Sequence, residues 1–303
     1  MDRSPVIVTE GLTKYYGQLA ALEGLAVEVR RGEVFGLLGP NGSGKTTAIR
    51  LLLGMLRPTA GWAKVGGFDV WRDSLEVRRQ VSYLPGEIRM YQSMTGYQML
   101  KLLSNLRDGV GLDRAVAIGE RVMELDLGRK IRTFSTGMKQ KLALAQVFSD
   151  PVDTLILDEP TSALDPSARG LVLDLVRDAR SAGQSVIFSG HVLSEVEQVA
   201  DRVAIMRKGR LMHLEDMHER KRARMLLLRF QVGAMVEVPA MLELHPRDQT
   251  DGVLLFEHRG ALQPLLEWLA AAPVADVAIG VDDLQSLYDR FHGPGALVSE
   301  NGA

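Results

Sequence analysis

The chain has 303 residues, 46% hydrophobic and 24% charged, a composition typical of a globular protein with room for one large and one small domain. Its net charge of -2 argues against nucleic acid as a partner, and the absence of cysteine excludes disulfides and thiol chemistry. Charged residues interrupt every apolar run and no secretory signal opens the chain, so we expect a protein that is soluble or that associates with a membrane only through a partner.

Short apolar or alternating runs, separated by turn signals, predict strands that alternate with helices over residues 5–214. Strands are expected at 6–13, 25–30, 34–38, 63–65, 81–84, 154–157, 185–188, 203–206 and 210–214. Helices are expected from a Gly-rich loop to residue 54, and at 74–80, 95–106, 113–125, 135–148, 167–182 and 194–200, with Thr95, Asp113 and Ser135 as caps. This order predicts an α/β fold with a mainly parallel central sheet. The first strands are expected to form a separate antiparallel sheet.

The character of the sequence changes near residue 215. Residues 215–222 are strongly charged, which favours a solvated helix face or a linker. Strands at 225–230, 253–256 and 274–281, with helices at 262–271 and 284–291, predict a small α+β accessory module over residues 215–292. It carries no motif that we can assign to chemistry, and 293–303 is expected to be a flexible tail.

A Gly-rich loop between the strand at 34–38 and the first helix matches the phosphate-binding pattern. Its backbone N–H groups and the helix N-terminus favour bound phosphate. Lys45 is expected to reach the β- and γ-phosphates, and Thr46 to supply a hydroxyl to Mg²⁺. A chance Gly-rich turn is the alternative, and the strand, loop and helix order argues against it. The predicted phosphate site is Gly39-Pro40-Asn41-Gly42-Ser43-Gly44-Lys45-Thr46-Thr47.

Two carboxylates follow the apolar strand at 154–157. Asp158 stands where such folds hold Mg²⁺ through a water, and Glu159 is the expected general base for activating water. For Glu159 the alternative is a structural carboxylate at the strand end that forms a salt bridge. We prefer the catalytic one because a phosphate loop precedes the pair in the same chain.

Over residues 6–214 the chain resembles the nucleotide-binding subunits of ABC transporters. The motifs that carry the resemblance, in chain order, are Tyr16 before Gly17, the phosphate loop, Phe134-Ser135-Thr136-Gly137-Met138-Lys139-Gln140-Lys141, Thr154 to Thr161, Ser162-Ala163-Leu164-Asp165 and Ser189-Gly190-His191. The resemblance implies a P-loop NTPase fold with a nucleotide-binding domain at 5–214 and a helical subdomain at about 87–150. It also implies ATP as the nucleotide, with Mg²⁺.

The family's roles fit the residue types. Tyr16 would stack on adenine, although Tyr15 could replace it or the ring could be a packing aromatic. His191 would contact the γ-phosphate and Glu159, completing a catalytic group with Lys45. Asp165 would belong to the D-loop. The signature, Ser135, Thr136, Gly137 and Met138, would bind the γ-phosphate held by another subunit, so a dimer is implied.

Two departures from the family pattern stand out. The signature usually reads Leu-Ser-Gly-Gly-Gln, whereas here Thr136 and Met138 replace a Gly and the Gln. The Gln that family members usually place near Mg²⁺ is absent, because the strand end reads Tyr83-Leu84-Pro85-Gly86-Glu87. Glu87 either substitutes for that Gln or faces solvent.

With these two departures, the sequence resembles the ATPase subunits of bacterial exporters for drugs, antibiotics and lipids, whose membrane protein is a separate chain. We therefore expect an ATPase at the cytoplasmic face of the membrane, working as a homodimer, or a heterodimer with a paralogue, on a polytopic permease. The surface that contacts the permease is expected near residues 85–106. There Met90, Tyr91, Met94 and Met99 could form an apolar groove, or they could pack within the domain. Import, an ATPase of translation or DNA repair, and a non-hydrolysing regulatory subunit are the alternatives.

Overall fold

The computed structural model describes residues 4–222, 224–231, 238–250 and 253–280, together with Leu284, Tyr288 and Phe291. The chain divides into two compact units, Met1–Glu215 and Asp216–Ala303, which are described separately. Among the described residues, no helix has the length and apolar character needed to cross a bilayer.

Two sheets form the first unit. An antiparallel sheet has the order β2-β1-β4-β5, and a six-stranded sheet has the order β10-β9-β3-β8-β7-β6, in which the pairs from β6 to β9 are parallel. The expected mainly parallel central sheet is therefore confirmed. The strands are β1 (Pro5–Tyr16), β2 (Leu19–Arg30), β3 (Val34–Leu38), β4 (Ala60–Val65), β5 (Phe68–Asp69), β6 (Val81–Leu84), β7 (Thr154–Asp158), β8 (Ser185–Gly190), β9 (Arg202–Arg207) and β10 (Arg210–Asp216).

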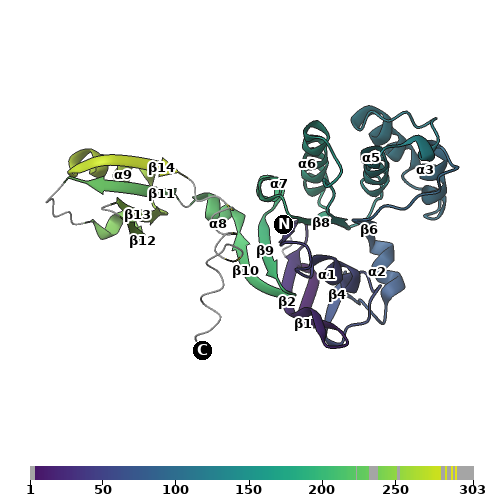
Figure 1. Cartoon of the computed structure of the whole chain (residues 1–303), viewed down its shortest axis with the longest axis horizontal. Helices are drawn as coiled ribbons and strands as arrows, with labels where there is room; N and C mark the ends of the chain where they lie inside the picture. Colours follow the sequence, from purple (N-terminus) through teal and green to yellow (C-terminus); the bar gives the residue numbers. More distant parts are fainter. Residues whose placement is uncertain are drawn as a thin grey trace. The chain divides into compact units, whose positions relative to one another are not determined.

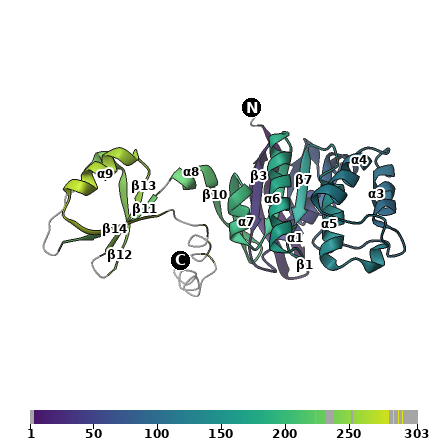
Figure 2. The ribbon, with the colours of Figure 1, turned by 90° about the horizontal axis from the view of Figure 1, so that it is seen from above.

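Helices lie on both sides of the six-stranded sheet. In Figure 1, α1 lies on one side of β6 and β8, and α5 and α6 lie on the other. Both views group α3 with α5 (Figures 1 and 2). The helices are α1 (Lys45–Leu52), α2 (Ser74–Gln80), α3 (Gly96–Asn105), α4 (Leu112–Ala117) with a π-turn at Ile118–Val122, a 3-10 turn at Ile131–Thr133, α5 (Thr136–Val147), α6 (Pro166–Ser181) and α7 (Leu193–Val199).

Two of the three predicted caps begin their helices as expected. Thr95 forms a capping box with Gln98 before α3, and Ser135 accepts a hydrogen bond from the Met138 N–H before α5. Asp113 was expected to cap the next helix, and this is wrong: Gly111 is the cap, with φ of 83°. A Cβ at Gly111 would approach the Ser149 carbonyl oxygen to 2.8 Å, so the chain entry to α4 requires glycine there.

The main core encloses α1 between the two sheets. Side chains of α1 pack against both the antiparallel sheet and the parallel one, which fixes the phosphate loop at the start of α1. Each such side chain contributes roughly 1.5–3 kcal/mol when fully buried. Buried members from the three layers are Ile49 and Leu52 of α1, Ile7 and Leu22 of the antiparallel sheet, and Ile156 and Ile187 of the parallel sheet.

A buried ion pair joins β9 to the turn before β3. Arg202 contacts both carboxylate oxygens of Glu33, at 2.5 and 2.9 Å, and both side chains are at most 10% exposed. We expect Glu33→Ala to destabilise the first unit by about 3–5 kcal/mol, because it leaves the guanidinium buried without its carboxylate. Thermal unfolding measures the loss of stability in Glu33→Ala, and Glu76→Ala is the control variant. Glu76 pairs with Arg79 at the surface, so the Glu76→Ala protein should unfold like wild type. An equal loss of stability in Glu33→Ala and Glu76→Ala would contradict a stabilising role for the buried pair.

The second unit is a four-stranded sheet with the order β12-β13-β11-β14 and antiparallel pairs. Leu226, Leu228, Phe256 and Leu265 form its core. Its elements are α8 (Met217–Arg222), β11 (Arg224–Phe230), a 3-10 turn at Ala240–Leu242, β12 (Leu244–Thr250), β13 (Val253–His258), α9 (Leu262–Ala271) and β14 (Val274–Gly280).

Sequence analysis did not predict β12, because its run from Leu244 to Thr250 is polar and contains Pro246. An edge strand tolerates such a sequence. The helix expected at 284–291 and the tail expected at 293–303 lie outside the described residues, apart from Leu284, Tyr288 and Phe291.

Candidate active site

The loop between β3 and α1 depends on glycine at two close approaches. A Cβ on Gly39 would lie 2.5 Å from the Met206 carbonyl oxygen. Gly44, the residue before α1, has φ of 104°, and a Cβ there would lie 2.8 Å from the Ala21 carbonyl oxygen. Neither contact is tolerable, so these positions hold the loop tight at the N-terminus of α1.

Lys45 begins α1 and is only 5% exposed. Its Nζ donates to the carbonyl oxygens of Gly39, at 2.6 Å, and Pro40, at 3.3 Å, and lies 3.8 Å from the Glu159 carboxylate. Burial lowers the pKa of the Lys45 amine, while the carboxylates of Glu159 and Asp158 oppose that shift. The amine is thus held where the loop and the acidic strand end meet.

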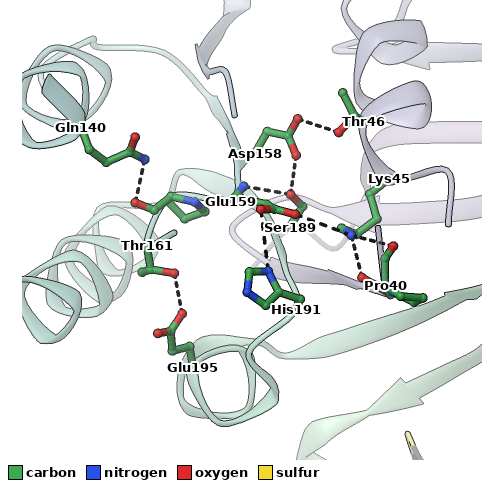
Figure 3. A network of polar contacts seen from close by, with 12 residues as sticks. Pro40, Lys45, Thr46, Gln140, Asp158, Glu159, Thr161, Ser189, His191 and Glu195 are labelled. Atoms are coloured by element: carbon green, nitrogen blue, oxygen red, sulfur yellow. Dashed lines mark hydrogen bonds and ion pairs between the residues drawn. The ribbon is translucent and has the colours of Figure 1, made fainter. Parts of the chain in front are cut away.

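Asp158, at the end of β7, is 2% exposed and accepts two hydroxyl hydrogen bonds. Thr46 donates to one carboxylate oxygen at 3.0 Å and Ser189 donates to the other at 2.7 Å (Figure 3). Ser189 Oγ also accepts the Glu159 N–H at 3.1 Å. Sequence analysis gave Ser189 no role of its own, although a polar residue at the end of β8, two before His191, was a signal.

Glu159 and His191 meet beside this group. His191 Nδ1 lies 3.7 Å from a Glu159 carboxylate oxygen, and Figure 3 shows the two side chains facing each other. Glu159 has φ of 50°, a left-handed conformation that is uncommon for a residue with a Cβ. Such strain persists only where the surrounding contacts maintain it, and it is common at catalytic positions.

The donor set fits a magnesium nucleotide. The Thr46 hydroxyl and the Asp158 carboxylate are hard oxygen ligands of the kind Mg²⁺ prefers. Ser43 Oγ is buried and has no hydrogen-bond partner among the residues that the structure describes. A buried hydroxyl in this condition suits a phosphate oxygen as its acceptor.

A pocket of about 300 Å³ lies against the loop. Tyr16 lines it and is 49% exposed, whereas Tyr15 is absent from its lining. Tyr16 is therefore better placed than Tyr15 to stack on a base. The other lining residues are Leu19, Ala20, Ala21, Asn41, Gly42, Ser43, Gly44, Lys45, Thr46, Thr47 and Glu159.

We expect Tyr16→Ala to weaken ATP binding by about tenfold, because stacking of one base on an aromatic ring is worth about 1–3 kcal/mol. Titration of the purified chain with a fluorescent ATP analogue measures the affinity. Tyr15→Ala is the matched control and should bind like wild type. A larger loss in Tyr15→Ala would assign the stacking ring to Tyr15 instead.

The signature residues lie elsewhere in the chain. Ser135 caps α5, and Ser135 and Thr136 are exposed at that helix N-terminus. In the described part of the chain they do not line the pocket beside the phosphate loop. A Cβ on Gly137 would lie 2.9 Å from the Ala163 carbonyl oxygen, so α5 begins in close contact with the segment before Asp165. Met138 supplies the N–H that Ser135 accepts.

Asp165 caps α6 in this chain. Its carboxylate accepts the Ala168 N–H at 2.9 Å, and this hydrogen bond holds the pKa of the carboxyl below its ordinary value. Glu87 lies at the surface, with a side chain 77% exposed and paired with Arg89. The structure thus favours a Glu87 side chain that faces solvent over one that substitutes for the Gln of the family. A Cβ on Gly86 would lie 3.6 Å from an Asp158 carboxylate oxygen, an ordinary contact.

Comparison with known proteins agrees with this geometry. A family model described as ABC transporter matches residues 22–162. The daunorubicin resistance ATP-binding protein DrrA3 of Streptomyces coeruleorubidus is 40% identical over 210 residues, which cover 68% of this chain and 66% of DrrA3. The bacitracin transport ATP-binding protein BcrA of Bacillus licheniformis is 29% identical over 308 residues, covering 97% of this chain and 99% of BcrA.

Solved structures share the fold of the first unit. An ATP-binding subunit of an ABC transporter is 27% identical, with a TM-score of 0.65 over 72% of this chain and 92% of that one. The ATP-binding cassette MJ0796, solved as a dimer bound to ADP and Pi, is 19% identical, with a TM-score of 0.63 over 70% of this chain and 98% of that one. The chain therefore belongs to the ABC transporter family, as an ATP-binding subunit that hydrolyses ATP.

Proposed function

We propose that this ATPase powers the export of a drug-like, antibiotic or lipid compound through a separate polytopic permease, at the cytoplasmic face of the membrane. The observation that carries the ATP-driven part of the proposal is the convergence of Lys45, Asp158, Glu159 and His191 around the phosphate loop. The names of DrrA3 and BcrA, which refer to daunorubicin resistance and bacitracin transport, support an exporter.

In this proposal the loop N–H groups and Lys45 bind the β- and γ-phosphates. Glu159 accepts a proton from the water that attacks the γ-phosphate, and His191 orients Glu159 and contacts the same phosphate. Thr46 and Asp158 would hold Mg²⁺, which when bound neutralises charge on the phosphate oxygens. The short distances from Glu159 to Lys45 and His191, 3.8 and 3.7 Å, support these roles.

Two chains would complete two sites. The exposed N-terminus of α5, with Ser135, Thr136, Gly137 and Met138, would bind the γ-phosphate held by a second copy or by a paralogue. The separation of these residues from the pocket in their own chain supports binding in trans. Closure of the dimer on ATP and reopening after hydrolysis would then drive the permease.

We propose that the permease contacts a groove of about 290 Å³ beside β6. The four residues expected to form a coupling groove, Met90, Tyr91, Met94 and Met99, do not line this one, and they differ in exposure, since Met99 is 6% exposed and Tyr91 is 63% exposed. Leu106, 75% exposed, lines this groove and also a second pocket, where Leu75, 58% exposed, adds apolar surface next to Arg78, Arg79 and Arg107. An amphipathic helix with acidic residues fits this chemistry. The groove is lined by Leu53, Met55, Arg78, Val81, Ser82, Tyr83, Leu103, Leu106, Arg107, Gln146 and Asp150.

The alternative of a soluble ATPase in translation or DNA repair finds no support in the comparisons, because the relatives described above are named as resistance and transport proteins. The net charge of -2 also gives no reason to expect nucleic acid as the main partner. Glu159, Lys45 and His191 together argue against a non-hydrolysing subunit.

Capture from native membranes tests the proposal. Tagged Glu159→Gln protein, incubated with ATP, should retain a polytopic membrane protein in equal amount. Leu106→Asp in the same background should reduce the yield, whereas Leu262→Asp, at a 40% exposed position of α9, should not. Recovery of ribosomal or DNA-processing proteins with no membrane protein would contradict the transport assignment.

A further inference from the structure

Glu195 is a buried carboxylate to which the proposed mechanism gives no role. It lies on α7 and is 7% exposed. One of its oxygens accepts the Thr161 hydroxyl at 2.5 Å, and the other accepts Arg169 Nη1 at 3.2 Å. Figure 3 shows Thr161 and Glu195 facing each other next to Glu159 and His191.

These contacts join the two chain segments that carry Glu159 and His191. Thr161 follows Glu159 by two residues, and Glu195 follows His191 by four. The hydrogen bond between Thr161 and Glu195 therefore closes a loop around the carboxylate and the imidazole. Short backbone spans on either side leave little freedom for the two groups to move apart.

Arg169 connects the Glu195 carboxylate to the D-loop. Arg169, which pairs with Glu195, donates Nε to the Leu164 carbonyl oxygen at 3.0 Å. From the other side, Gln140 of α5 donates to the Pro160 carbonyl oxygen at 2.8 Å. The segment from Pro160 to Leu164 is thus held by side chains from α5, α6 and α7.

The backbone conformation of Glu159 explains why such a network is needed. A left-handed φ of 50° costs about 1–3 kcal/mol in a residue with a side chain, so neighbouring contacts have to maintain it. Misplacement of a catalytic group by about 1 Å can lower a rate by about a hundredfold. A buried carboxylate is itself costly unless it is paired, and Arg169 and Thr161 supply that pairing.

We propose that Glu195 is a positioning residue: with Thr161 and Arg169 it clamps the segment after Glu159 to the helix after His191. The clamp sets the geometry of the general base and leaves nucleotide binding unaffected. This inference rests on the proposed hydrolytic role of Glu159. The predicted signature is a loss of kcat at nearly constant KM for ATP, together with faster backbone amide exchange in the clamped segments.

Variants of Thr161 and Glu195 in the full chain test the clamp. Thr161→Val removes the hydroxyl at similar volume and should lower kcat by about ten- to a hundredfold, with KM for ATP within about threefold of wild type. Thr161→Ser keeps the hydroxyl and should restore most of the rate. Glu195→Gln removes the charge that pairs with Arg169, and its cost in the Thr161→Val background should be smaller than its cost in wild type, because both changes act on the same clamp. Glu197→Gln, on the same helix, is the matched control.

Hydrogen exchange gives a readout that does not need turnover. Thr161→Val should speed exchange of the amides between Glu159 and Leu164 by at least about tenfold, and Glu197→Gln should not. A Thr161→Val protein with wild-type kcat and exchange would overturn the clamp. A Thr161→Ser protein as slow as Thr161→Val would do the same. If wild type hydrolyses no ATP, the proposed function fails, and the exchange result still decides the clamp.

Discussion

Replacing Glu159 by Gln is expected to lower ATP turnover by about 10²–10⁴-fold, the usual contribution of a general base. The amide keeps the size of the side chain but cannot accept the proton from the attacking water. Lys45, Asp158 and the loop remain in place, so ATP should still bind. Steady-state phosphate release measures turnover, and light scattering should show a dimer that persists with ATP.

Glu197→Gln is a suitable control for this change, since it makes the same substitution outside the site. It should turn over ATP like wild type and form no persistent dimer. Unchanged turnover in Glu159→Gln would remove Glu159 as the base. Loss of ATP binding in that variant would show that the carboxylate acts in binding instead.

Replacing Lys45 by Ala is expected to weaken ATP binding by tens of fold to about a hundredfold. A hydrogen bond to a charged group is worth about 1.5–3 kcal/mol, and every 1.4 kcal/mol is tenfold in affinity. Lys45 is the buried cation next to the loop, held by the Gly39 and Pro40 carbonyl oxygens. Calorimetric titration with Mg-ATP measures the change.

Lys64→Ala controls for the loss of one positive charge, because Lys64 is exposed and stacks over Trp62 on the antiparallel sheet. It should bind ATP like wild type. Wild-type affinity in Lys45→Ala would contradict the phosphate-loop assignment.

Sequence alone predicted the parts of this protein whose signals are local. The apolar strand β3, the loop and the start of α1 follow one another in the chain, and so do β7, Asp158 and Glu159. Their chemistry depends on neighbours within a few residues. The cap at Thr95 is equally local, because its partner Gln98 is three residues away.

Contacts between distant segments could not be predicted in the same way. Thr161 and Glu195 are 34 residues apart, and Asp158 and Ser189 are 31 apart, so no spacing rule brings them together. The strand β12 was missed because its partner β13 defines it more than its own polar sequence does. Asp113 failed as a cap because the left-handed Gly111 already starts α4.

The most direct measurement is the ATPase activity of the purified chain as a function of its concentration, with and without Mg²⁺. If two copies complete each site, activity per molecule rises with concentration and levels off once dimers form. Chelation of Mg²⁺ should abolish it, and Glu159→Gln should show almost none at any concentration. Activity per molecule that is constant down to nanomolar concentration, or that survives chelation, would contradict the account of a magnesium-dependent site shared by two chains.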